Sequence, residues 1–467
     1  MRFYPIIPAD LLSWQTRRIR DLDHRSNASQ MVDFASDGCL GTCSISFVTL
    51  AGMKIPKFFR RFGPGLLVTA AFIGPGTVTK ATTAGANFGH TLLWAVGFSV
   101  IATIVFQEMA SRLGIVTGRG LGEAIRPTIR NAFARGLAIV LVVSAIIVGN
   151  AAYQAGNIAG AAVGISAATG MQHQAVVSIV IGLAAWGILM IGHYRSLQRI
   201  LVALVVTMSS VFLLTAFSVP IDWRSFALGW IKPTIPDGGL KEVLAIIGTT
   251  VVPYNLFLHA TASAEKWSGE KESVSDETVR DAIQQSRGDT ILSVGLGGLV
   301  TAAVMATAAA AFFRSDAGFT NLADAARQLE PLLGNHARWL FDVGLFAAGL
   351  TSTITAPLAA AYAAAGCFGW PIDLKDWRLR TVFTTVIVFG TSFAASGSKP
   401  TDIITFAQVA NGLLLPLLAI FLLAVMNNAA LLGKHRNHWI ANTLGVLTVV
   451  VVTVLGLRSL VSVFFSG

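Results

Sequence analysis

Gly74-Pro75-Gly76-Thr77 stands in the middle of an apolar run that extends from about residue 64 to residue 85. Pro75 has no N–H to donate, and its ring collides with the carbonyl one turn earlier, so it interrupts an α-helix. The flanking glycines lower the cost of leaving helical dihedral angles. A second run, at about 240–262, contains the interruption Val252-Pro253-Tyr254-Asn255. In lipid, freed backbone groups need partners, so such breaks survive only where protein or a polar cavity covers them.

Composition places the chain in a membrane. Of its 467 residues, 54% are hydrophobic and only 12% are charged, against about 25% charged in an ordinary soluble domain. Many runs exceed the roughly 18 apolar residues that indicate a bilayer span. The net charge of +10 mainly sets topology in such a protein and does not indicate nucleic acid binding. There is no nucleotide-binding motif and no hydrolytic constellation. We therefore do not expect the protein to be an ATP-driven pump or an enzyme, and we do not expect it to bind a cofactor.

The first 50 residues differ from the rest. They mix charged and polar residues and contain no long apolar run and no signal-peptide pattern. Met53 is a plausible alternative start, so residues 1–52 are interpreted as a disordered tail or an upstream extension, and residues 53–467 as one transmembrane transporter domain. Cys39 and Cys43 have no nearby His or further Cys, and a zinc site there is not expected.

The apolar runs predict an all-α polytopic protein with eleven transmembrane spans. The spans are expected at 64–84, 92–115, 137–166, 175–192, 197–218, 240–262, 289–313, 338–367, 381–397, 403–425 and 438–462. Longer polar connections are expected at 218–239 and 263–288. Lys and Arg are concentrated in alternate connections, with none at 167–174 and Lys399 alone before the tenth span. This distribution predicts a cytoplasmic N-terminus in a bacterial-type plasma membrane.

The breaks fall in the first and sixth spans. This arrangement is typical of two five-helix halves related by an inverted repeat, followed here by one extra helix. Interrupted spans in corresponding positions of two halves are the best sequence pointer to a transporter's binding site. The alternative is that both prolines make kinks that serve only helix packing.

Several stretches together resemble one family. They are Gly63 to Leu67 with the first break, Leu93-Trp94 through Gln107 to Gly118, Pro253 to His259, and Gly344 to Thr355. These resemble the Nramp family of divalent metal transporters over about residues 54–460. The resemblance implies the LeuT-type fold of five plus five helices in an inverted repeat, and alternating access in which the first and sixth spans move.

The chain departs from the family pattern at the expected metal site. The family motif Asp-Pro-Gly-Asn, whose Asp and Asn bind the metal, is replaced by Gly74 and Thr77 at those two positions. Val252 stands in place of a methionine, and Tyr254 in place of a histidine. The residue that offers a backbone carbonyl aligns with Thr249. The third-span region Gly149–Asn157 lacks the Asp and Glu that serve proton movement in the family.

The remaining polar residues predict a weak site. Thr77, Tyr254, Asn255, Gln408 and Asn411 can supply hydroxyl and amide oxygens, with carbonyls from the unwound segments. Such a site suits a hydrated cation held weakly, because hard cations otherwise want carboxylates and transition metals accept thioether or imidazole. It could equally hold a neutral or anionic solute, since the half-helix that starts near Thr77 points its amide end at the site.

Coupling or gating is assigned to Lys80, Asn150, Gln154 and His259. Lys80 would oppose a bound cation, or it could snorkel to the outer interface. His259 is the remaining proton-coupling candidate, against a satisfied core histidine. Asn150 and Gln154 share a helix with Tyr153 and Asn157, whose polar groups could instead join helices.

Glu108 lies four residues before Arg112, a spacing that favours a structural ion pair over a proton relay.

Taken together, the broken spans and the resemblance predict a secondary transporter of a small ion, nominally a divalent metal cation, that is ion- or proton-coupled. The alternative is a transporter of a neutral or anionic solute on the same scaffold. In either case the partners of the protein would be the lipid bilayer and the transported substrate. A third possibility is a sensor that binds a solute without transporting it, and no sequence feature specifically supports that.

Overall fold

A computed structural model describes residues 73–465, with gaps at 172, 193–194, 269–275, 314–318 and 320. The predicted tail at 1–52, Cys39, Cys43 and the start of the predicted first span lie outside the described residues. Over the described ranges the chain is helical and contains no strand. Nine helical segments in this part of the chain are long and apolar enough to cross a membrane. The protein is thus an integral membrane protein built from α-helices.

The longer helices follow the predicted spans closely. They are α3 (Pro75–Phe88), α4 (Leu93–Thr117), α6 (Ala132–Thr169), α7 (Gln174–Ile191), α8 (Arg195–Ser218), α10 (Leu240–Thr250), α11 (Pro253–Ser268), α12 (Asp276–Phe312), α14 (Ala337–Phe368), α15 (Trp377–Ala394), α16 (Pro400–Met426) and α18 (Trp439–Phe465). Short helical segments join them: α5 (Ile125–Thr128), α9 (Trp223–Ile231), η4 (Leu322–Leu329), α13 (Glu330–Leu333), η5 (Gly334–His336), α17 (Ala429–Leu432) and η6 (Gly433–His435).

Two expectations about the connections are wrong. Helix α12 begins at Asp276 rather than at residue 289, because the polar stretch before the apolar run continues the helix, with Asp276 and Glu277 in its first turn. The polar connection at 218–239 contains α9, which Asp222 caps by accepting hydrogen bonds from the N–H groups of Arg224 and Ser225. The count of eleven spans stays a prediction, since α3 and α15 are not among the nine and the part of the predicted first span before residue 73 lies outside the described residues.

The break in the sixth span is confirmed. Helix α10 ends at Thr250, and the N–H of Val251 still reaches the carbonyl of Ile247. Helix α11 then starts at Pro253, a position where the missing N–H of proline costs nothing. Helix α3 likewise starts at Pro75, after an extended Gly74 with φ −112° and ψ −174°. The residues that would form the other half of the first break lie before residue 73.

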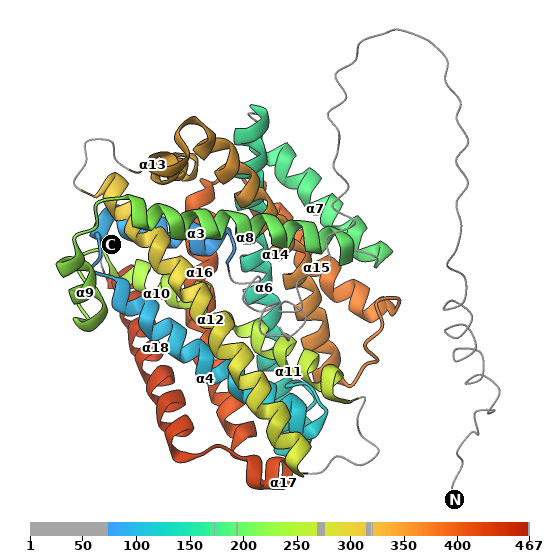
Figure 1. The fold of residues 1–467 in the computed structure, drawn as a ribbon. Coiled ribbons are helices and arrows are strands. Elements are labelled where there is room, and N and C mark those ends of the chain that lie inside the picture. Colours follow the sequence, from blue (N-terminus) through green and yellow to red (C-terminus); the bar gives the residue numbers. More distant parts are fainter. Residues whose placement is uncertain are drawn as a thin grey trace, which may run out of the picture. The chain divides into compact units, whose positions relative to one another are not determined.

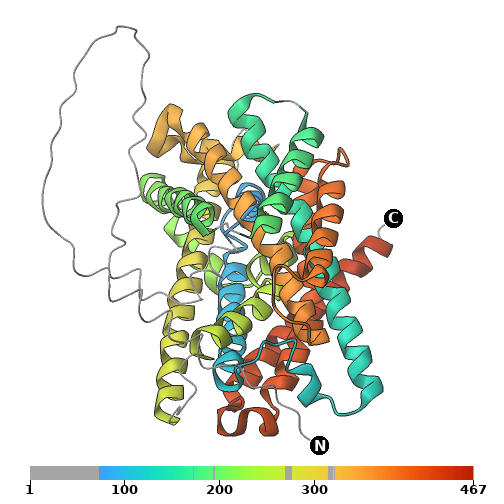
Figure 2. The same ribbon diagram turned by 90° about the vertical axis from the view of Figure 1, so that its right-hand side faces the viewer.

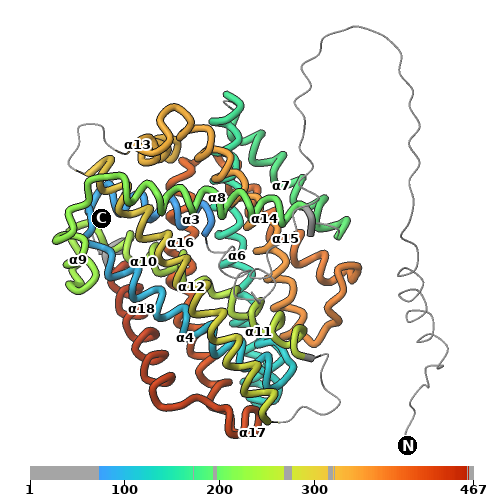
Figure 3. Tube along the Cα trace, viewed as in Figure 1, coloured from blue at the N-terminus to red at the C-terminus, as the bar shows by residue number. Residues whose placement is uncertain are grey.

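The packing of the helices shows which elements lie around the helix starts at Pro75 and Pro253. Helix α6 packs against α14, α15 and α16, and Figure 3 shows α6, α14 and α15 side by side, away from α18. Helix α3 packs against α12 and α10, and α8 lies across α12 and α14 (Figure 1). Figure 2 shows α12 running beside α4. Close approach needs glycine: a Cβ on Gly114 of α4 would lie 2.2 Å from the carbonyl oxygen of Ala260 on α11.

Candidate substrate site

The start of α3 is held tightly between two other helices. A Cβ on Gly160 of α6 would lie 2.2 Å from the Cβ of Pro75, so only glycine leaves room for the proline ring. A Cβ on Gly76 would lie 2.3 Å from Nε2 of Gln408 on α16. Gly76 of the first break therefore does more than free the backbone. It lets α16 approach the first turn of α3 directly, as Gly160 does for α6.

The end of α10 meets the same turn. The hydroxyl oxygens of Thr77 and Thr249 lie 3.0 Å apart and share a hydrogen bond, although the residues are 172 positions apart in the chain. A Cβ on Gly248 would lie 1.9 Å from the carbonyl oxygen of Gln408. The predicted site residues Gly74, Thr77, Thr249 and Gln408 are thus brought together from α3, α10 and α16.

Unpartnered polar atoms gather on the helices around this junction. Each belongs to a residue that is no more than 2% exposed, and each lacks a hydrogen-bond partner. A buried polar group without a partner costs about 1–3 kcal/mol, so these atoms are suited to bind water or a solute. They are Asn157 Nδ2 on α6, Asn255 Oδ1 on α11, Ser352 Oγ on α14, and Gln408 Oε1 and Asn411 Nδ2 on α16.

Val252 and Tyr254 are buried at the break in the sixth span. Both are 1% exposed. Val252 offers only its backbone carbonyl, which accepts a hydrogen bond of 3.1 Å from the N–H of Asn255. The ring of Tyr254 stands edge-on to that of Tyr153, with centroids 5.4 Å apart, and this contact joins α11 to α6.

Lys80 is neither free nor at the surface. Its ammonium donates to both carboxylate oxygens of Glu242, at 3.0 and 2.9 Å, and to the hydroxyl of Thr405 at 2.8 Å. The residue is only 2% exposed, so the snorkelling alternative is wrong. The argument that Lys80 opposes a bound cation also fails, because Glu242 balances its charge. Sequence reasoning missed Glu242 because it stands at the edge of the sixth apolar run.

The other coupling candidates have ordinary partners. Gln154 donates from Nε2 to the carbonyl of Thr353 at 3.0 Å and so joins α6 to α14. Asn150 donates to the carbonyl of Ile146 in its own helix. Nδ1 of His259 lies 2.8 Å from Oε1 of Gln107 on α4, and its Nε2 is buried without a partner. Their role in coupling stays a prediction.

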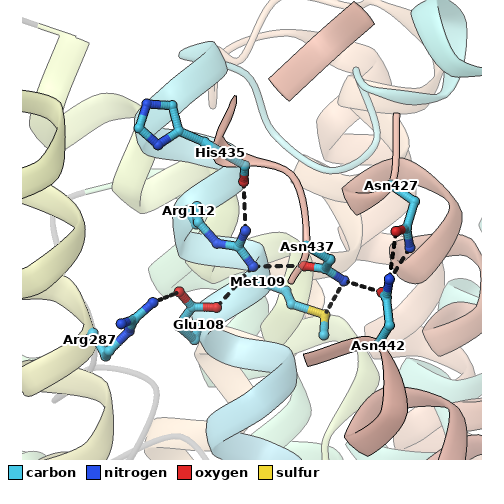
Figure 4. Close-up of polar contacts among 8 residues, drawn as sticks. All are labelled: Glu108, Met109, Arg112, Arg287, Asn427, His435, Asn437 and Asn442. Atoms are coloured by element: carbon cyan, nitrogen blue, oxygen red, sulfur yellow. Dashed lines mark hydrogen bonds and ion pairs between the residues drawn. The ribbon is translucent and has the colours of Figure 1, made fainter. Parts of the chain in front are cut away.

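The expected ion pair of Glu108 and Arg112 is confirmed and is part of a larger network (Figure 4). Glu108 also pairs with Arg287 of α12 at 2.9 Å. Arg112 donates to the carbonyl of His435 and to Oδ1 of Asn437, in the connection between α16 and α18. Glu108 is therefore held between two guanidinium groups that tie α4 to its neighbours.

Carboxylates are scarce at the junction. Across the described ranges, no group of three or more His, Cys, Asp or Glu residues could hold a metal ion. Any cation at the junction would meet amide, hydroxyl and carbonyl oxygens, since Glu242 is occupied by Lys80. A weak site therefore stays a prediction.

The comparisons with known proteins fit this architecture. The family model of natural resistance-associated macrophage protein-like (Nramp) proteins matches residues 65–462. The chain belongs to the Nramp family. It is 31% identical over 386 residues to a divalent metal cation transporter MntH of Acidiphilium cryptum, covering 82% of this chain and 85% of that protein. An MntH of Yersinia pestis is 31% identical over 407 residues, covering 86% and 94%.

Solved structures support the same fold. A manganese transporter of Eremococcus coleocola, in complex with an aromatic bis-isothiourea compound, superposes with a TM-score of 0.70 at 24% identity, covering 88% of each chain. Mhp1, a nucleobase-cation-symport-1 family transporter, superposes with a TM-score of 0.50 at 14% identity, covering 85% and 90%. Both likenesses concern the fold alone. They confirm the transporter fold that the resemblance implied.

Proposed function

We propose that this Nramp protein is a secondary transporter that moves a divalent metal cation by alternating access. The observation that carries the proposal is the meeting of the start of α3, at Pro75 to Thr77, with the end of α10, just before the break of the sixth span, in a chain of this family whose surrounding helices carry unpartnered buried polar atoms. The MntH relatives are divalent metal cation transporters by name, which supports the same substrate class.

The ligands available define how the cation would be held. Asn255 Oδ1 and Gln408 Oε1 are buried acceptors without partners. The hydroxyls of Thr77 and Thr249 share a hydrogen bond, and a Cβ on Gly76 would come within 3.0 Å of both Thr249 and Gln408. Neutral oxygens replace only part of a hydration shell, and an ion such as Mg²⁺ or Mn²⁺ usually keeps several waters where few carboxylates bind it. The cation would therefore bind weakly and partly hydrated.

The moving and fixed parts follow from the packing. We assign α3, α10 and α11 to the moving part, because both helix starts belong to them. Helices α6, α14 and α15 form the supporting part, since they pack side by side. With the N-terminus cytoplasmic, as the distribution of Lys and Arg predicts, the Lys80–Glu242 pair lies on the outer side of the site. Ion or proton coupling, the division into residues 1–52 and 53–467, and plasma membrane location stay predictions.

A neutral or anionic solute as the sole substrate has lost one of its three supports. Lys80 would have attracted negative charge, but Glu242 neutralises it. The absence of the family's acidic residues and the amide end of α3 remain, and they do not outweigh the family relationship.

Uptake into proteoliposomes tests the proposal. Purified protein is reconstituted, and entry of Mn²⁺ and of Mg²⁺ is followed with an internal metal-sensitive dye, with protein-free liposomes as the background. We expect saturable uptake of at least one divalent cation, and stronger Mn²⁺ uptake by the variant Gly74→Asp/Thr77→Asn/Val252→Met, which supplies a carboxylate, an amide and a thioether. Uptake of no divalent cation by the parent protein would overturn the proposal. Equal Mn²⁺ uptake by parent and variant would show that the description of the ligands is wrong.

A further inference from the structure

Lys80, Glu242 and Thr405 form a cluster with one residue each from α3, α10 and α16, here called the outer layer. Nζ of Lys80 lies 3.0 and 2.9 Å from the two carboxylate oxygens of Glu242 and 2.8 Å from the hydroxyl oxygen of Thr405. That hydroxyl donates its own proton to the carbonyl of Thr401 at 2.6 Å, so its oxygen accepts from Lys80. Three acceptor oxygens from two helices thus converge on one positive charge.

These oxygens have the chemistry of a cation site. Hard divalent cations bind oxygen ligands that include a carboxylate, at about 2.0–2.6 Å. The ammonium of Lys80 stands where such an ion would stand, at the slightly longer distances of hydrogen bonds. The protein's own cation therefore fills a place whose ligands also suit a metal ion.

The candidate substrate site is built from the same three helices. Thr77 on α3, Thr249 on α10 and Gln408 on α16 are here called the inner layer. The hydroxyls of Thr77 and Thr249 share a hydrogen bond, and a Cβ on Gly76 would come within 3.0 Å of Thr249 and Gln408. Each layer thus takes one polar side chain from each helix.

The spacing along the helices sets one layer above the other. On α3 and α16 the members of the two layers are three residues apart, and on α10 they are seven residues apart. Residues with these spacings share a helix face. A cation that moves along the contact of α3, α10 and α16 would therefore meet the outer layer one to two helical turns before the inner layer.

Solvent reaches the outer layer at Glu242. The side chain of Glu242 is 14% exposed, whereas that of Lys80 is 2% exposed. A cavity of about 620 Å³ lies at the start of α10 and is lined by Asp237, Leu240 and Lys241, among others. Lys241 directly precedes Glu242, so the cavity brings solvent to the turn that carries the carboxylate.

We propose that the outer layer is an entry site for the divalent cation, which displaces the Lys80 ammonium from Glu242 and Thr405 on its way to the inner layer. This inference rests on the proposed function and adds a second cation site to it. With the ammonium in place, the carboxylate is not left without a counter-charge. When the metal binds, the flexible four-carbon stem of Lys80 lets its charge move away. Glu242 is thus a ligand of the entering metal, and Lys80 is a tethered competitor.

Two single variants separate this role from a structural one. Lys80→Ala and Glu242→Gln break the same ion pair, so a pair that only supports the fold should give both variants the same defect. An entry site predicts opposite effects. Lys80→Ala removes the competitor and should lower the half-saturating Mn²⁺ concentration about tenfold, whereas Glu242→Gln removes the charge of the ligand and should raise it about tenfold.

Mn²⁺ uptake is measured in intact bacterial cells that express each variant, because only the outer face then meets the added metal. Rates are normalised to the amount of folded protein, and cells with an empty vector give the background. Lys232→Ala and Glu330→Gln are the matched controls, since each removes a similar charge from an exposed side chain. Both should keep the half-saturating concentration of the parent protein.

Binding is measured separately on purified, metal-free protein, by electron paramagnetic resonance of the Mn²⁺ that stays unbound in a titration. Lys80→Ala should bind one Mn²⁺ more per chain than Lys80→Ala/Glu242→Gln, because the freed oxygens then hold an ion without competition. This count does not depend on transport.

A shift of the half-saturating concentration in the same direction in both single variants, or an equal number of bound ions, would overturn this inference and leave the proposed function intact. If Lys80→Ala does not fold with or without Mn²⁺, Glu242→Gln decides, and an unchanged half-saturating concentration in that variant overturns the inference. No uptake of any divalent cation by the parent protein would overturn the proposed function.

Discussion

The Lys80 ammonium and the Glu242 carboxylate form a buried ion pair in which Nζ lies 3.0 and 2.9 Å from the two carboxylate oxygens. The pair joins α3 to α10, and Thr405 adds a third contact from α16. Glu242 lies in the first turn of α10, where a negative charge is also favoured by the helix dipole. Helices α10 and α16 both pack against α3, so the pair ties these three helices together beside the site.

Breaking this pair should destabilise the protein strongly. Lys80→Met leaves the Glu242 carboxylate partly buried without its counter-charge, a change that typically costs about 3–5 kcal/mol. Replacing both partners, as in Lys80→Met/Glu242→Leu, should recover most of that loss, because no uncompensated charge remains. The midpoint of thermal unfolding in detergent ranks the variants by stability, and the double variant should unfold at a higher temperature than Lys80→Met.

Lys241 provides the control. It precedes Glu242 in the chain but is exposed, so Lys241→Met should change stability by no more than about 0.5 kcal/mol. A Lys80→Met midpoint equal to that of Lys241→Met would show that the ion pair does not stabilise the fold.

Gly248 should tolerate no side chain. Its Cβ would lie 1.9 Å from the carbonyl oxygen of Gln408 and 2.8 Å from the amide nitrogen of Gly412, both backbone atoms of α16. Gly248→Ala would force α10 and α16 apart, at a cost of about 1–3 kcal/mol or more, and would displace Gln408 from the site. We expect a lower unfolding midpoint together with reduced metal uptake.

Gly295→Ala is the matched change in another membrane helix. No atom lies within 4 Å of the Cβ that it adds, and alanine favours a helix by about 1 kcal/mol over glycine. It should leave uptake unchanged and stability equal or slightly higher. Normal uptake by Gly248→Ala would contradict the close packing of α10 on α16.

The sequence predicts the helices better than it predicts the partners of their polar residues. Pro253 and the apolar runs locate the sixth-span break and most helix ends, because these depend on local backbone chemistry and on bilayer thickness. Glu242 could not be matched to Lys80 in this way, since the two are 162 residues apart and meet only when α3 and α10 pack. The same holds for His259 and Gln107, which are 152 residues apart. Local patterns give no information on such contacts.

Arg112 should fix the connection between α16 and α18. It donates to the His435 carbonyl at 2.6 Å and to Asn437 Oδ1 at 2.7 Å, while Asn437 also donates to Oδ1 of Asn442 (Figure 4). Arg112→Leu removes both contacts and leaves the buried Oδ1 of Asn437 without this donor. Hydrogen exchange of the amides in residues 427–438 should become faster.

Arg287→Ala tests whether faster exchange at residues 427–438 is specific to the loss of Arg112. Arg287 also pairs with Glu108, but its side chain is 54% exposed, and such pairs are typically worth about 0–1 kcal/mol. Exchange at 427–438 should stay near the parent rate in this variant. Equal acceleration in both variants would mean that loss of any partner of Glu108, rather than the bonds of Arg112, loosens the connection.

His90 should make the docking of α9 sensitive to pH. It lies in the connection between α3 and α4, is 9% exposed, and stands edge-on to Phe226 of α9 with ring centroids 5.6 Å apart. Burial lowers the pKa of His90 below its ordinary value of 6.5, and the nearby charge of Asp222 opposes this shift only in part. When α9 is released, the imidazole binds a proton more readily than it does when α9 is docked.

The sign of the effect follows from that difference. Well above pH 6.5 the imidazole is neutral in both states and does not affect docking. As the pH falls from 6.5 toward the depressed pKa, the released state gains protons first, so docking of α9 weakens. After correction for the intrinsic pH dependence of exchange, the amides of α9 should exchange faster at the lower pH.

His90→Gln keeps a polar side chain that does not titrate, and it should abolish this pH dependence. His336→Gln removes a histidine that is exposed and should preserve it. If α9 in the His90→Gln variant loses protection over the same pH range as in the parent protein, another group controls its docking, because no ionisable side chain then remains at position 90.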